Sequence, residues 1–322
     1  MIGPDFPLPI HHGSVLTVGT FDGLHRGHQD VLARLVALAA REALPSLVVT
    51  FEPHPLQVVN PAAAPPLLTL HQEKLELLAQ SGVDYVVVLP FTPQLAALEA
   101  SAFVDTVLLE RLALRHLLVG HDHGFGRGRL GDSDVLRALG ESRGFRVTVL
   151  DPVQGAGGHP VSSTAIRRAI AGGDLDRAAA ALGRPFSVAG TVVRGDQRGR
   201  TLGYPTLNLS PTPATKLLPP DGVYAVRVQL PAGEFGGMLN LGPRPTVGDP
   251  VRRIETHVFD ASGDWYGAPV RLDFLRRLRG VRAFSGLPAL RAQLAEDERA
   301  ARVALSRSPG RGGWLPPAVS HF

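Results

Sequence analysis

Short apolar segments alternate with helical patterns along the first 150 residues of the chain. Five of these segments are runs of aliphatic and β-branched residues and are predicted to be strands: Ser14–Val18, Leu47–Thr50, Tyr85–Leu89, Leu117–Val119 and Val147–Leu150. Strands that are apolar on both faces and separated by helices are typical of a parallel sheet covered by helices on both sides. The sequence therefore predicts a Rossmann-like α/β domain for this half of the chain.

Helices are predicted between these strands, over residues 28–42, 73–80, 102–114 and 134–141. The first of them carries its leucine and valine residues at helical spacing, which gives it one apolar face. A further helix is predicted at Leu175–Leu182, because Asp174 can cap its start and Gly183 and Pro185 would end it.

The pattern changes after Pro185. Segments at Ser187–Val193 and Val223–Leu230 are separated by Gly, Pro and Asp turns and have no helix between them. In the second segment alternate residues are apolar, whereas Arg227 and Gln229 belong to the opposite face. The same alternation sets Val270, Leu272 and Phe274 against Arg271 and Asp273. These segments predict a mostly antiparallel sheet or a small barrel with one face exposed to water.

A final amphipathic helix is predicted at Leu287–Leu305. Its inner face is expected to hold Leu287, Leu290, Leu294 and Ala301. The whole pattern divides the chain into an α/β domain over residues 1–183, a mostly β domain with a C-terminal helix over 184–306, and a flexible tail rich in Gly, Pro and Arg over 307–322.

Composition excludes several kinds of site. The chain has no cysteine, so disulfides, thiolate metal sites and cysteine nucleophiles are ruled out. No apolar run reaches the length of a membrane span, and the N-terminus lacks the basic and apolar regions of a secretory signal. We therefore expect a cytoplasmic protein without a membrane partner.

The basic residues are almost all of one type. All but two of the 33 are arginine, the exceptions being Lys74 and Lys216, and the net charge is +4. Arginine suits bidentate contacts with phosphate, so an anionic partner is expected, although genome composition could produce the same bias. No basic strand studded with aromatic residues accompanies this charge, and nucleic acid is therefore not expected as a partner.

The segment Gly19–His28 lies directly between the first predicted strand and the first predicted helix. Such a turn presents free backbone N–H groups and the positive end of a helix dipole, which suits a phosphate. Gly19, Gly23 and Gly27 would let the backbone approach it closely. His25 and His28 could both donate to its oxygens and stabilise charge that develops during attack on an α-phosphate. The alternative, that the two histidines are half of a metal site, has no third ligand nearby in the sequence.

A second set of polar residues lies in the later half, within the loop Gly190–Gly203 and the segment that follows it. No G-x-x-x-x-G-K-[ST] sequence occurs, which excludes a Walker-type kinase. Thr206 and Asn208, two residues apart on an extended segment, would place two oxygen ligands on one side, as Mg²⁺ prefers. Glu255 is out of phase with Ile254 on a strand and could accept the proton of a substrate hydroxyl, or be an ordinary exposed glutamate.

These motifs resemble those of the bacterial bifunctional riboflavin kinase/FAD synthetases, whose N-terminal module is an HxGH nucleotidyltransferase. The resemblance rests on five segments of the first half and three of the second: Gly19–His28, Thr50–Pro55, Leu68–Leu78, Gly120–Gly128, Ser162–Arg167, Pro205–Asn208, Asn240–Thr246 and Ile254–Asp260. In the fourth of these, His123 stands where the family usually has phenylalanine.

The resemblance implies a Rossmann-like HxGH nucleotidyltransferase domain followed by a flavokinase-type β-barrel domain with a C-terminal helix. It implies that riboflavin and ATP give FMN, that FMN and ATP give FAD, and that both steps use Mg²⁺. The catalytic residues would be His25, His28 and Glu255, and the metal ligands Thr206 and Asn208. Residues expected to bind ATP in the adenylyltransferase site are Gly19, Thr20, Phe21, Asp22, Gly23, Gly27, Asp122, Arg127, Ser162, Ser163, Thr164 and Arg167. Those expected to bind ATP or flavin in the kinase site are Gly195, Arg198, Gly199, Arg200, Gly203, Pro205, Asn240 and Arg244.

Two alternatives stay open at this point: a flavokinase whose first domain binds nucleotide without turnover, and a nucleic-acid-binding module. The sequence contains no feature that indicates the oligomeric state.

Overall fold

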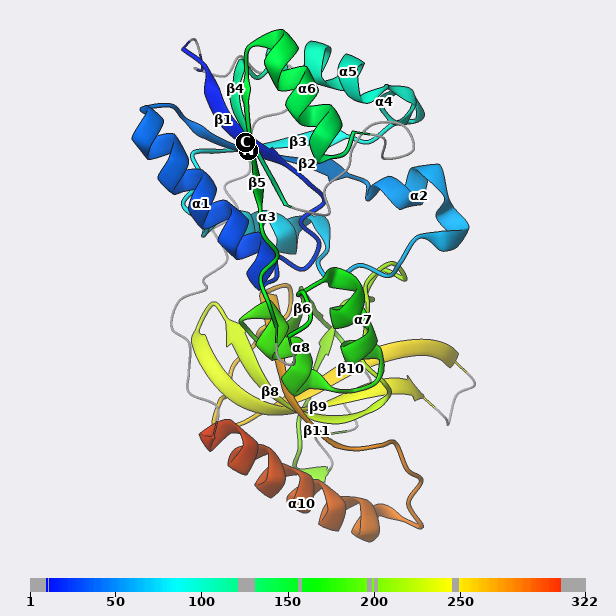
Figure 1. Ribbon diagram of the computed structural model, residues 1–322. Helices are drawn as coiled ribbons and strands as arrows, with labels where there is room; N and C mark the ends of the chain where they lie inside the picture. The colour runs from blue at the N-terminus through cyan, green and yellow to red at the C-terminus, as the bar shows by residue number, and fades with distance from the viewer. Residues whose placement is uncertain are drawn as a thin grey trace. The chain divides into compact units, whose positions relative to one another are not determined.

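The structure is a computed structural model, which describes residue 10 and residues 12–120, 131–155, 158–195, 199, 202–244 and 249–307 (Figure 1). Its contacts divide the chain into two compact units, Met1–Ser163 and Thr164–Phe322. By this criterion the helices between residues 163 and 182 fall in the second unit, whereas the sequence pattern placed them in the first domain. The domain boundary between residues 183 and 184 stays a prediction.

The first unit contains a parallel sheet of five strands in the order β3-β2-β1-β4-β5. The strands are β1 (Ser14–Val18), β2 (Ser46–Glu52), β3 (Tyr85–Pro90), β4 (Leu114–Gly120) and β5 (Arg146–Leu150). The predicted α/β architecture is confirmed. The strand order reverses beside β1, and in open parallel sheets ligands bind at the carboxyl ends of the strands where such a reversal occurs.

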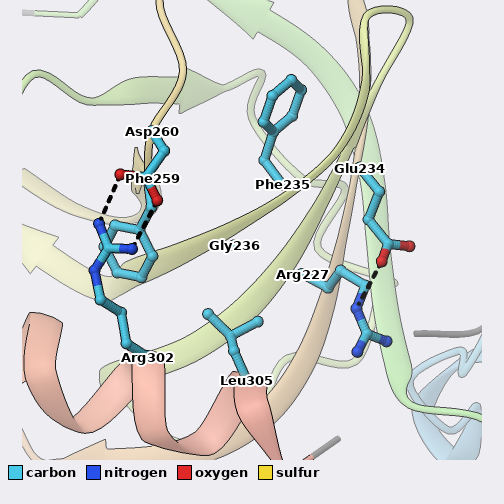
Figure 2. A pocket seen from close by; sticks show the side chains of 8 residues that line it. All are labelled: Arg227, Glu234, Phe235, Gly236, Phe259, Asp260, Arg302 and Leu305. Atoms are coloured by element: carbon cyan, nitrogen blue, oxygen red, sulfur yellow. Dashed lines mark hydrogen bonds and ion pairs between the residues drawn. The ribbon is translucent and has the colours of Figure 1, made fainter. Parts of the chain in front are cut away.

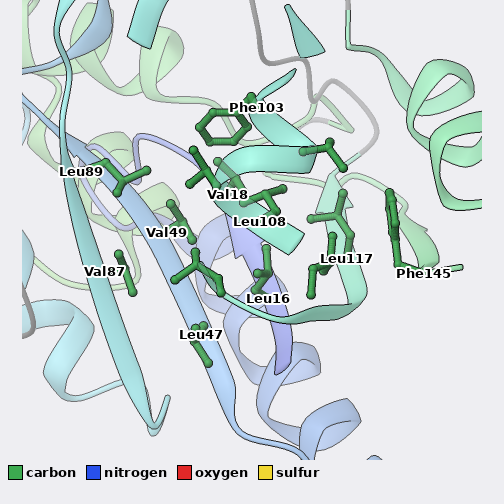
Figure 3. Close-up of a cluster of buried hydrophobic side chains, with 14 of the residues drawn as sticks. Leu16, Val18, Leu47, Val49, Val87, Leu89, Phe103, Leu108, Leu117 and Phe145 are labelled. Carbon is green, nitrogen blue, oxygen red and sulfur yellow. The ribbon is translucent and has the colours of Figure 1, made fainter. Parts of the chain in front are cut away.

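Helices cover both faces of this sheet. They are α1 (Arg26–Glu42), α2 (Pro55–Val59), η1 (Pro61–Ala63), α3 (His71–Ala79), α4 (Pro93–Ala97), α5 (Ala100–Phe103), η2 (Val104–Leu109) and α6 (Ser133–Arg143). On one face, leucines of α1 and α3 pack against Val15 and Val48. On the other face, α5, η2 and α6 pack against Leu16, Leu47 and Leu117 (Figure 3). Successive residues of a strand point to opposite faces of the sheet. Strands buried on both faces therefore need continuous apolar sequences, as these strands have.

One predicted helix is wrong in its form and its end. Residues 102–114 were expected to be a single helix, but α5 ends at Phe103, η2 (Val104–Leu109) is a π-helix, and Leu114 already begins β4. Ala113, just before β4, has a φ of 48°, a left-handed conformation that stops a helix. Periodicity alone could not locate this end, because the residues on both sides of it are equally apolar.

The helix α7 (Ser163–Ala171) starts at the last residue of the first unit, and the rest of it belongs to the second. It is followed by α8 (Leu175–Leu182), six strands and the helix α10 (Leu287–Ser306). The strands are β6 (Phe186–Val193), β7 (Leu207–Leu209), β8 (Gly222–Leu230), β9 (Gly233–Arg244), β10 (Asp249–Val258) and β11 (Pro269–Arg279). They form a closed barrel in the order β10-β7-β6-β11-β8-β9, with antiparallel pairs throughout. The predicted small barrel is confirmed.

The expectation that one barrel face is exposed to water is wrong for β8 and β11. Arg227, Gln229 and Asp273 are all buried. Part of this face is covered by α10, where Ala301 and Ala304 cluster with Ala225. The buried polar side chains are paired within the barrel: Arg227 and Gln229 with Glu234, and Asp273 with Arg271.

The inner face of α10 agrees with the prediction at Leu294 and Ala301, which pack on the barrel, and differs from it at Leu287. Leu287 is 67% exposed, whereas Gln293 and Asp297 are buried together with Ala301 and Ala304. Asp297 accepts hydrogen bonds from Arg279 on β11 and from Gln293. The helix thus docks partly through a buried ion pair, which an amphipathic pattern of leucines does not reveal. No helix among the described residues is both long and apolar enough to cross a membrane.

Candidate active sites

The loop between β1 and α1 has an unusual backbone. Phe21 and Leu24 have φ angles of 50° and 38°, and Gly23 has 81°. Left-handed residues other than glycine are uncommon and concentrate at functional sites. The loop ends at His25, which is the N-cap residue of α1. It therefore brings a histidine to the start of the helix, at the carboxyl end of β1.

His25 and His28 lie against each other at this helix start. Their rings are stacked with centroids 3.7 Å apart and an interplanar angle of 15°. The backbone N–H of His28 donates to Nδ1 of His25 at 3.3 Å, so the ring proton of neutral His25 is on Nε2. A Cβ at Gly27 would come within 3.2 Å of the His25 ring, which explains the glycine between the two histidines.

Burial sets the charge of His28. Its Nδ1 atom is buried and has no hydrogen-bond partner among the described residues, and its ring is edge-on to Phe21 at 5.1 Å. Burial, with a further contribution from His25, holds the pKa of His28 well below its usual value. His28 is therefore neutral near pH 7 and can still donate one N–H to an anion.

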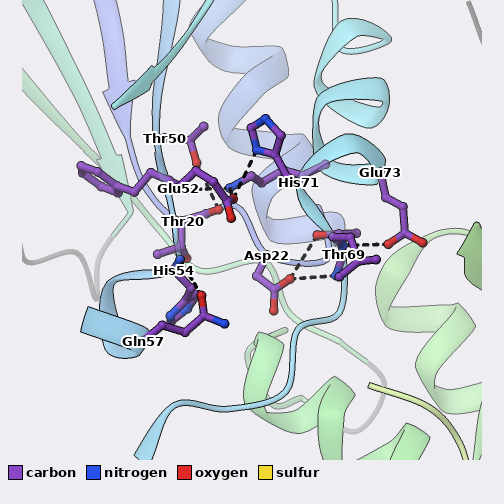
Figure 4. A network of polar contacts seen from close by, with 12 residues as sticks. Thr20, Asp22, Thr50, Glu52, His54, Gln57, Thr69, His71 and Glu73 are labelled. Atoms are coloured by element: carbon purple, nitrogen blue, oxygen red, sulfur yellow. Dashed lines mark hydrogen bonds and ion pairs between the residues drawn. The ribbon is translucent and has the colours of Figure 1, made fainter. Parts of the chain in front are cut away.

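Asp22 holds the same loop in place through hydrogen bonds of its carboxylate. Its carboxylate is buried and accepts from the backbone N–H groups of Leu68 and Thr69, at 3.0 and 2.9 Å, and from the Thr69 hydroxyl at 3.1 Å (Figure 4). The Thr69 hydroxyl also accepts from the N–H of Gly23 at 3.0 Å. Asp22 was predicted to bind ATP. These bonds give its carboxylate a role in holding the loop against the segment before α3.

Ser163 is joined to this loop as well. Its hydroxyl donates to the backbone oxygen of Asp22 at 2.9 Å. Thr20, another predicted residue, uses its backbone oxygen to accept from the Thr50 hydroxyl at 3.2 Å. The other predicted residues of this group, Ser162, Thr164 and Arg167, flank Ser163 at the start of α7. Their contacts with nucleotide stay predictions.

A polar network around the buried Lys74 lies at the end of β2, within the segments Thr50–Pro55 and Leu68–Leu78 that carry the resemblance, although the sequence assigned its residues no role (Figure 4). Lys74 Nζ donates to the Phe51 backbone oxygen at 2.9 Å and lies 3.8 Å from the Glu52 carboxylate, which also contacts His71 at 3.2 Å. Burial lowers the pKa of Lys74, while Glu52 and Asp22 act in the opposite direction. Besides these two segments, the sequence signal was Lys74 itself, one of two lysines in a chain whose other basic residues are arginine.

In the barrel, three predicted polar residues meet across adjacent strands. Glu255 on β10 is directly opposite Asn208 on β7 and directly opposite Asn240 on β9. Side chains of directly paired residues share a face and lie close together. The row faces outward, because His257, two residues along, is paired with Met238, which contacts α10. The register therefore gathers Asn208, Glu255 and Asn240 on the outer face of the barrel.

Gly195 lies directly beside this row. A Cβ at Gly195 would collide with the Asn208 carboxamide, so only glycine leaves that side chain its present place. Thr206 precedes β7 and shares the side of Asn208 by the alternation of an extended strand. These hydroxyl and carboxamide oxygens are the hard donors that suit Mg²⁺. Among the described residues no group of three His, Cys, Asp or Glu side chains could hold a metal ion.

Several predicted residues lie outside the described part of the chain. They are Asp122, Arg127, Arg198 and Arg200, together with His123. Gly199 is described, and its backbone oxygen accepts from Tyr204 at 2.9 Å, which closes the turn that contains Gly203. Arg244 ends β9. The flexible tail predicted for 307–322 is described only at Arg307.

A cavity of about 410 Å³ lies elsewhere on the barrel, between the start of β9, the end of β10 and α10 (Figure 2). Arg227 is paired with Glu234 at 3.1 Å, and Arg302 makes two hydrogen bonds to Asp260 at 2.7 and 3.0 Å. None of the predicted site residues lines it. Its arginines are engaged by carboxylates of the chain itself.

The comparisons with known proteins cover both units. The family model of FAD synthetase matches residues 8–165, and that of riboflavin kinase matches residues 182–305. The bifunctional riboflavin kinase/FMN adenylyltransferase of Escherichia coli K12 is 41% identical over 90% of this chain and 92% of its own length. The protein of the same description from Pseudomonas fluorescens is 40% identical over 94% of this chain and 96% of its own.

Among solved structures, one from Streptococcus pneumoniae described as a macrolide-efflux protein has the same fold over both units. It is 32% identical, with a TM-score of 0.83, and the match covers 92% of this chain and 96% of that chain. The two family matches follow one another along the chain, and the full-length relatives carry both descriptions in one protein. The chain belongs to the family of bifunctional riboflavin kinase/FMN adenylyltransferases, ATP-using enzymes that form FMN from riboflavin and FAD from FMN.

Proposed function

We propose that the two activities use the two residue groups described above: adenylylation of FMN at the start of α1, and phosphorylation of riboflavin at the Asn208–Glu255–Asn240 row. The observation that carries this proposal is that the groups lie in separate compact units, each matched by the corresponding family. We propose a role for each of these residues in its reaction, and the use of Mg²⁺ with ATP.

In the adenylyltransferase step, a phosphate oxygen of FMN attacks the α-phosphorus of ATP and forms a new P–O bond. The bond from that phosphorus to the bridging oxygen breaks, and pyrophosphate leaves. His25, through Nε2–H, and His28 donate hydrogen bonds to the α-phosphate oxygens as charge develops on them. Because the attacking group comes from FMN, no nucleophile of the protein is required. The sequence resemblance assigns Ser162, Ser163, Thr164 and Arg167 to the leaving pyrophosphate.

In the kinase step, the terminal ribityl hydroxyl of riboflavin attacks the γ-phosphorus of ATP, and ADP leaves. Glu255 accepts the proton of that hydroxyl. Thr206 and Asn208 would hold Mg²⁺, which when bound neutralises phosphate charge. Asn240, on the other side of Glu255, would orient the hydroxyl by a hydrogen bond.

Separate assays of the two steps test this assignment. The protein is supplied either with riboflavin, ATP and Mg²⁺ or with FMN, ATP and Mg²⁺, and FMN and FAD are resolved over time. We expect His28→Ala to lose FAD formation and keep FMN formation, and Glu255→Ala to do the reverse. The proposal is wrong if both variants stay folded and each loses both activities.

A further inference from the structure

His257 lies where the kinase site meets α10. It is two residues after Glu255 on β10, so the two side chains share the outer face of the barrel. Its ring is edge-on to Tyr204, with centroids 5.1 Å apart, and to Phe259 at 5.7 Å. These rings fix the imidazole in one orientation beside the predicted base.

The imidazole makes one short hydrogen bond to the segment that carries the predicted metal ligands. Nδ1 of His257 is 2.7 Å from the backbone oxygen of Pro205. A carbonyl oxygen can only accept, so the proton is on Nδ1 and His257 is the donor. Because a peptide group is planar, this bond orients the whole Pro205–Thr206 peptide, including the nitrogen of Thr206.

Among the described residues, the pairing of β7 with β10 does not reach the Pro205–Thr206 peptide. The strand β7 has three residues, and its pairing with β10 ends at the pair Leu207–Thr256. Thr206 therefore lies one residue past the last pair of the ladder. The side chain of His257 supplies, from β10, the cross-strand hydrogen bond that backbone pairing would otherwise have provided at this position.

Tyr204, just before Pro205, is held from α10. Its hydroxyl is hydrogen-bonded to Glu298, and burial together with this carboxylate raises the pKa of Tyr204. Glu298 in turn accepts from Arg302 at 2.9 Å. The segment Tyr204–Thr206 is thus held at one end by α10 and at its centre by His257.

We propose that His257 is a positioning residue of the kinase reaction: its Nδ1–H holds the Pro205–Thr206 peptide in register with Glu255, so that Thr206 presents its hydroxyl to the nucleotide-bound Mg²⁺ on the same side as the base. This inference rests on the proposed function, in which Thr206 is a metal ligand and Glu255 is the base. It assigns His257 no contact with riboflavin or ATP.

Two substitutions of His257 distinguish the effect of its Nδ1–H donor from the effect of its aromatic ring. His257→Asn keeps an N–H close to the position of Nδ1, whereas His257→Phe keeps an aromatic ring and removes the donor. We expect His257→Phe to raise the Mg²⁺ concentration that gives half-maximal FMN formation about two- to tenfold, the effect of losing one hydrogen bond. His257→Asn should stay within about twofold of the parent by the same argument. The riboflavin KM at saturating Mg²⁺ should not change in either variant.

A second readout needs no turnover. Riboflavin fluorescence anisotropy reports its binding in the presence of ADP, titrated with Mg²⁺, and the Phe variant should require more Mg²⁺ by the same factor. Thermal unfolding followed by circular dichroism checks that the barrel unit of each variant is folded, and FAD formation from FMN is the control for the first unit. If the barrel unit of His257→Phe is not folded, His257→Leu replaces it as the variant without a donor.

The possible results distinguish a failure of the role of His257 from a failure of the assignment of Thr206 as a metal ligand. Equal effects of Asn and Phe, no effect of Phe, or a raised riboflavin KM with unchanged Mg²⁺ dependence would each overturn the role of His257. Thr206→Val tests the underlying assignment, and it should raise the Mg²⁺ requirement more than His257→Phe does. If Thr206→Val leaves the Mg²⁺ requirement unchanged, both proposals fail. If it shifts the requirement and His257→Phe does not, only the inference on His257 is wrong.

Discussion

Glu255 and Asn208 face each other across the pairing of β10 with β7, although 47 positions of sequence separate them. The pairing consists of two residue pairs, and one of them is this one. A strand as short as β7 is therefore placed so that a carboxylate and a carboxamide share one face. Their proximity is a property of barrel register and not of any local motif.

The first prediction concerns Gly195, whose lack of a side chain leaves room for the Asn208 carboxamide opposite Glu255. Gly195→Ala would place a methyl group against the Asn208 carboxamide and displace it from its present position opposite Glu255. We expect FMN formation to fall at least about tenfold, since misplacement by an ångström in such a site costs up to 10²-fold. FAD formation supplied with FMN should be unchanged. Rates of both steps, measured at saturating ATP, check this.

Gly280→Ala is the matched control for this substitution. Gly280 lies in the same unit, and a Cβ there would make only an ordinary contact, 3.7 Å from Arg277. The Gly280 variant should keep both activities. Equal losses in the two variants would show that the effect at Gly195 has nothing to do with Asn208.

Asp22 gives the second prediction. Asp22→Asn keeps the shape of the side chain but replaces one of two accepting oxygens with an N–H₂ group, which then meets a backbone N–H of Leu68 or Thr69. A buried donor without an acceptor costs about 1–3 kcal/mol. We expect the free energy of unfolding of the first unit to fall by this amount and FAD formation to fall with it, because the same loop carries His25.

Urea unfolding followed by circular dichroism, together with the rate of FAD formation, measures both effects. Asp134→Asn is the control, since Asp134 is an exposed carboxylate in the first turn of α6. If Asp22→Asn unfolds at the same urea concentration as the parent, the carboxylate does not hold the loop.

The sequence was sufficient for the elements whose pattern is local. Continuous apolar runs determined the parallel sheet, and Asp174 with Gly183 determined both ends of α8, where Asp174 accepts from the N–H of Arg177 and Gly183 is left-handed. The stacked histidines could also be expected, because His25 and His28 are three apart at a helix start.

Features assembled from distant segments could not be predicted. Lys74 is buried between the end of β2 and the β1–α1 loop, and only the folded sheet brings Glu52 and Asp22 near it. The docking of α10 depends likewise on Arg279 from β11, so the helical pattern identified Leu294 and Ala301 on the inner face but could not reveal the buried Asp297. The role of His257 depends on where the β7 ladder ends, which is a matter of register.

His28 gives a pH-dependent prediction. Its pKa in the folded chain lies well below the ordinary value near 6.5, chiefly because of burial. As the pH falls below about 6.5, the unfolded chain binds a proton at this residue and the folded chain does not, so stability is lost. The contribution is at most about 1.4 kcal/mol per pH unit. His28→Gln should therefore lose less stability than the parent between pH 7 and pH 5.

Urea unfolding at pH 7, 6 and 5 measures this difference, and the titration of the His28 ring signal by NMR checks its cause. The signal, assigned by its absence in His28→Gln, should not shift until well below pH 6.5. Parallel stability curves for parent and variant would show that His28 titrates normally in the folded chain.

The last prediction concerns how α10 is held. Asp297, whose side chain is 3% exposed, accepts from Arg279 Nε at 2.9 Å and Nη2 at 2.7 Å. Asp297→Asn removes the charge and leaves the Arg279 guanidinium, 19% exposed, poorly compensated, which should cost about 2–4 kcal/mol of unfolding free energy in the barrel unit.

Asp260→Asn is the matched control, since Asp260 also pairs with an arginine, Arg302, but its side chain is 75% exposed and surface ion pairs contribute little. Because Arg302 also bonds to Glu298, it keeps a partner in that variant. Thermal unfolding of both variants decides the matter: equal melting temperatures would mean that burial of the Asp297 pair does not fasten the helix.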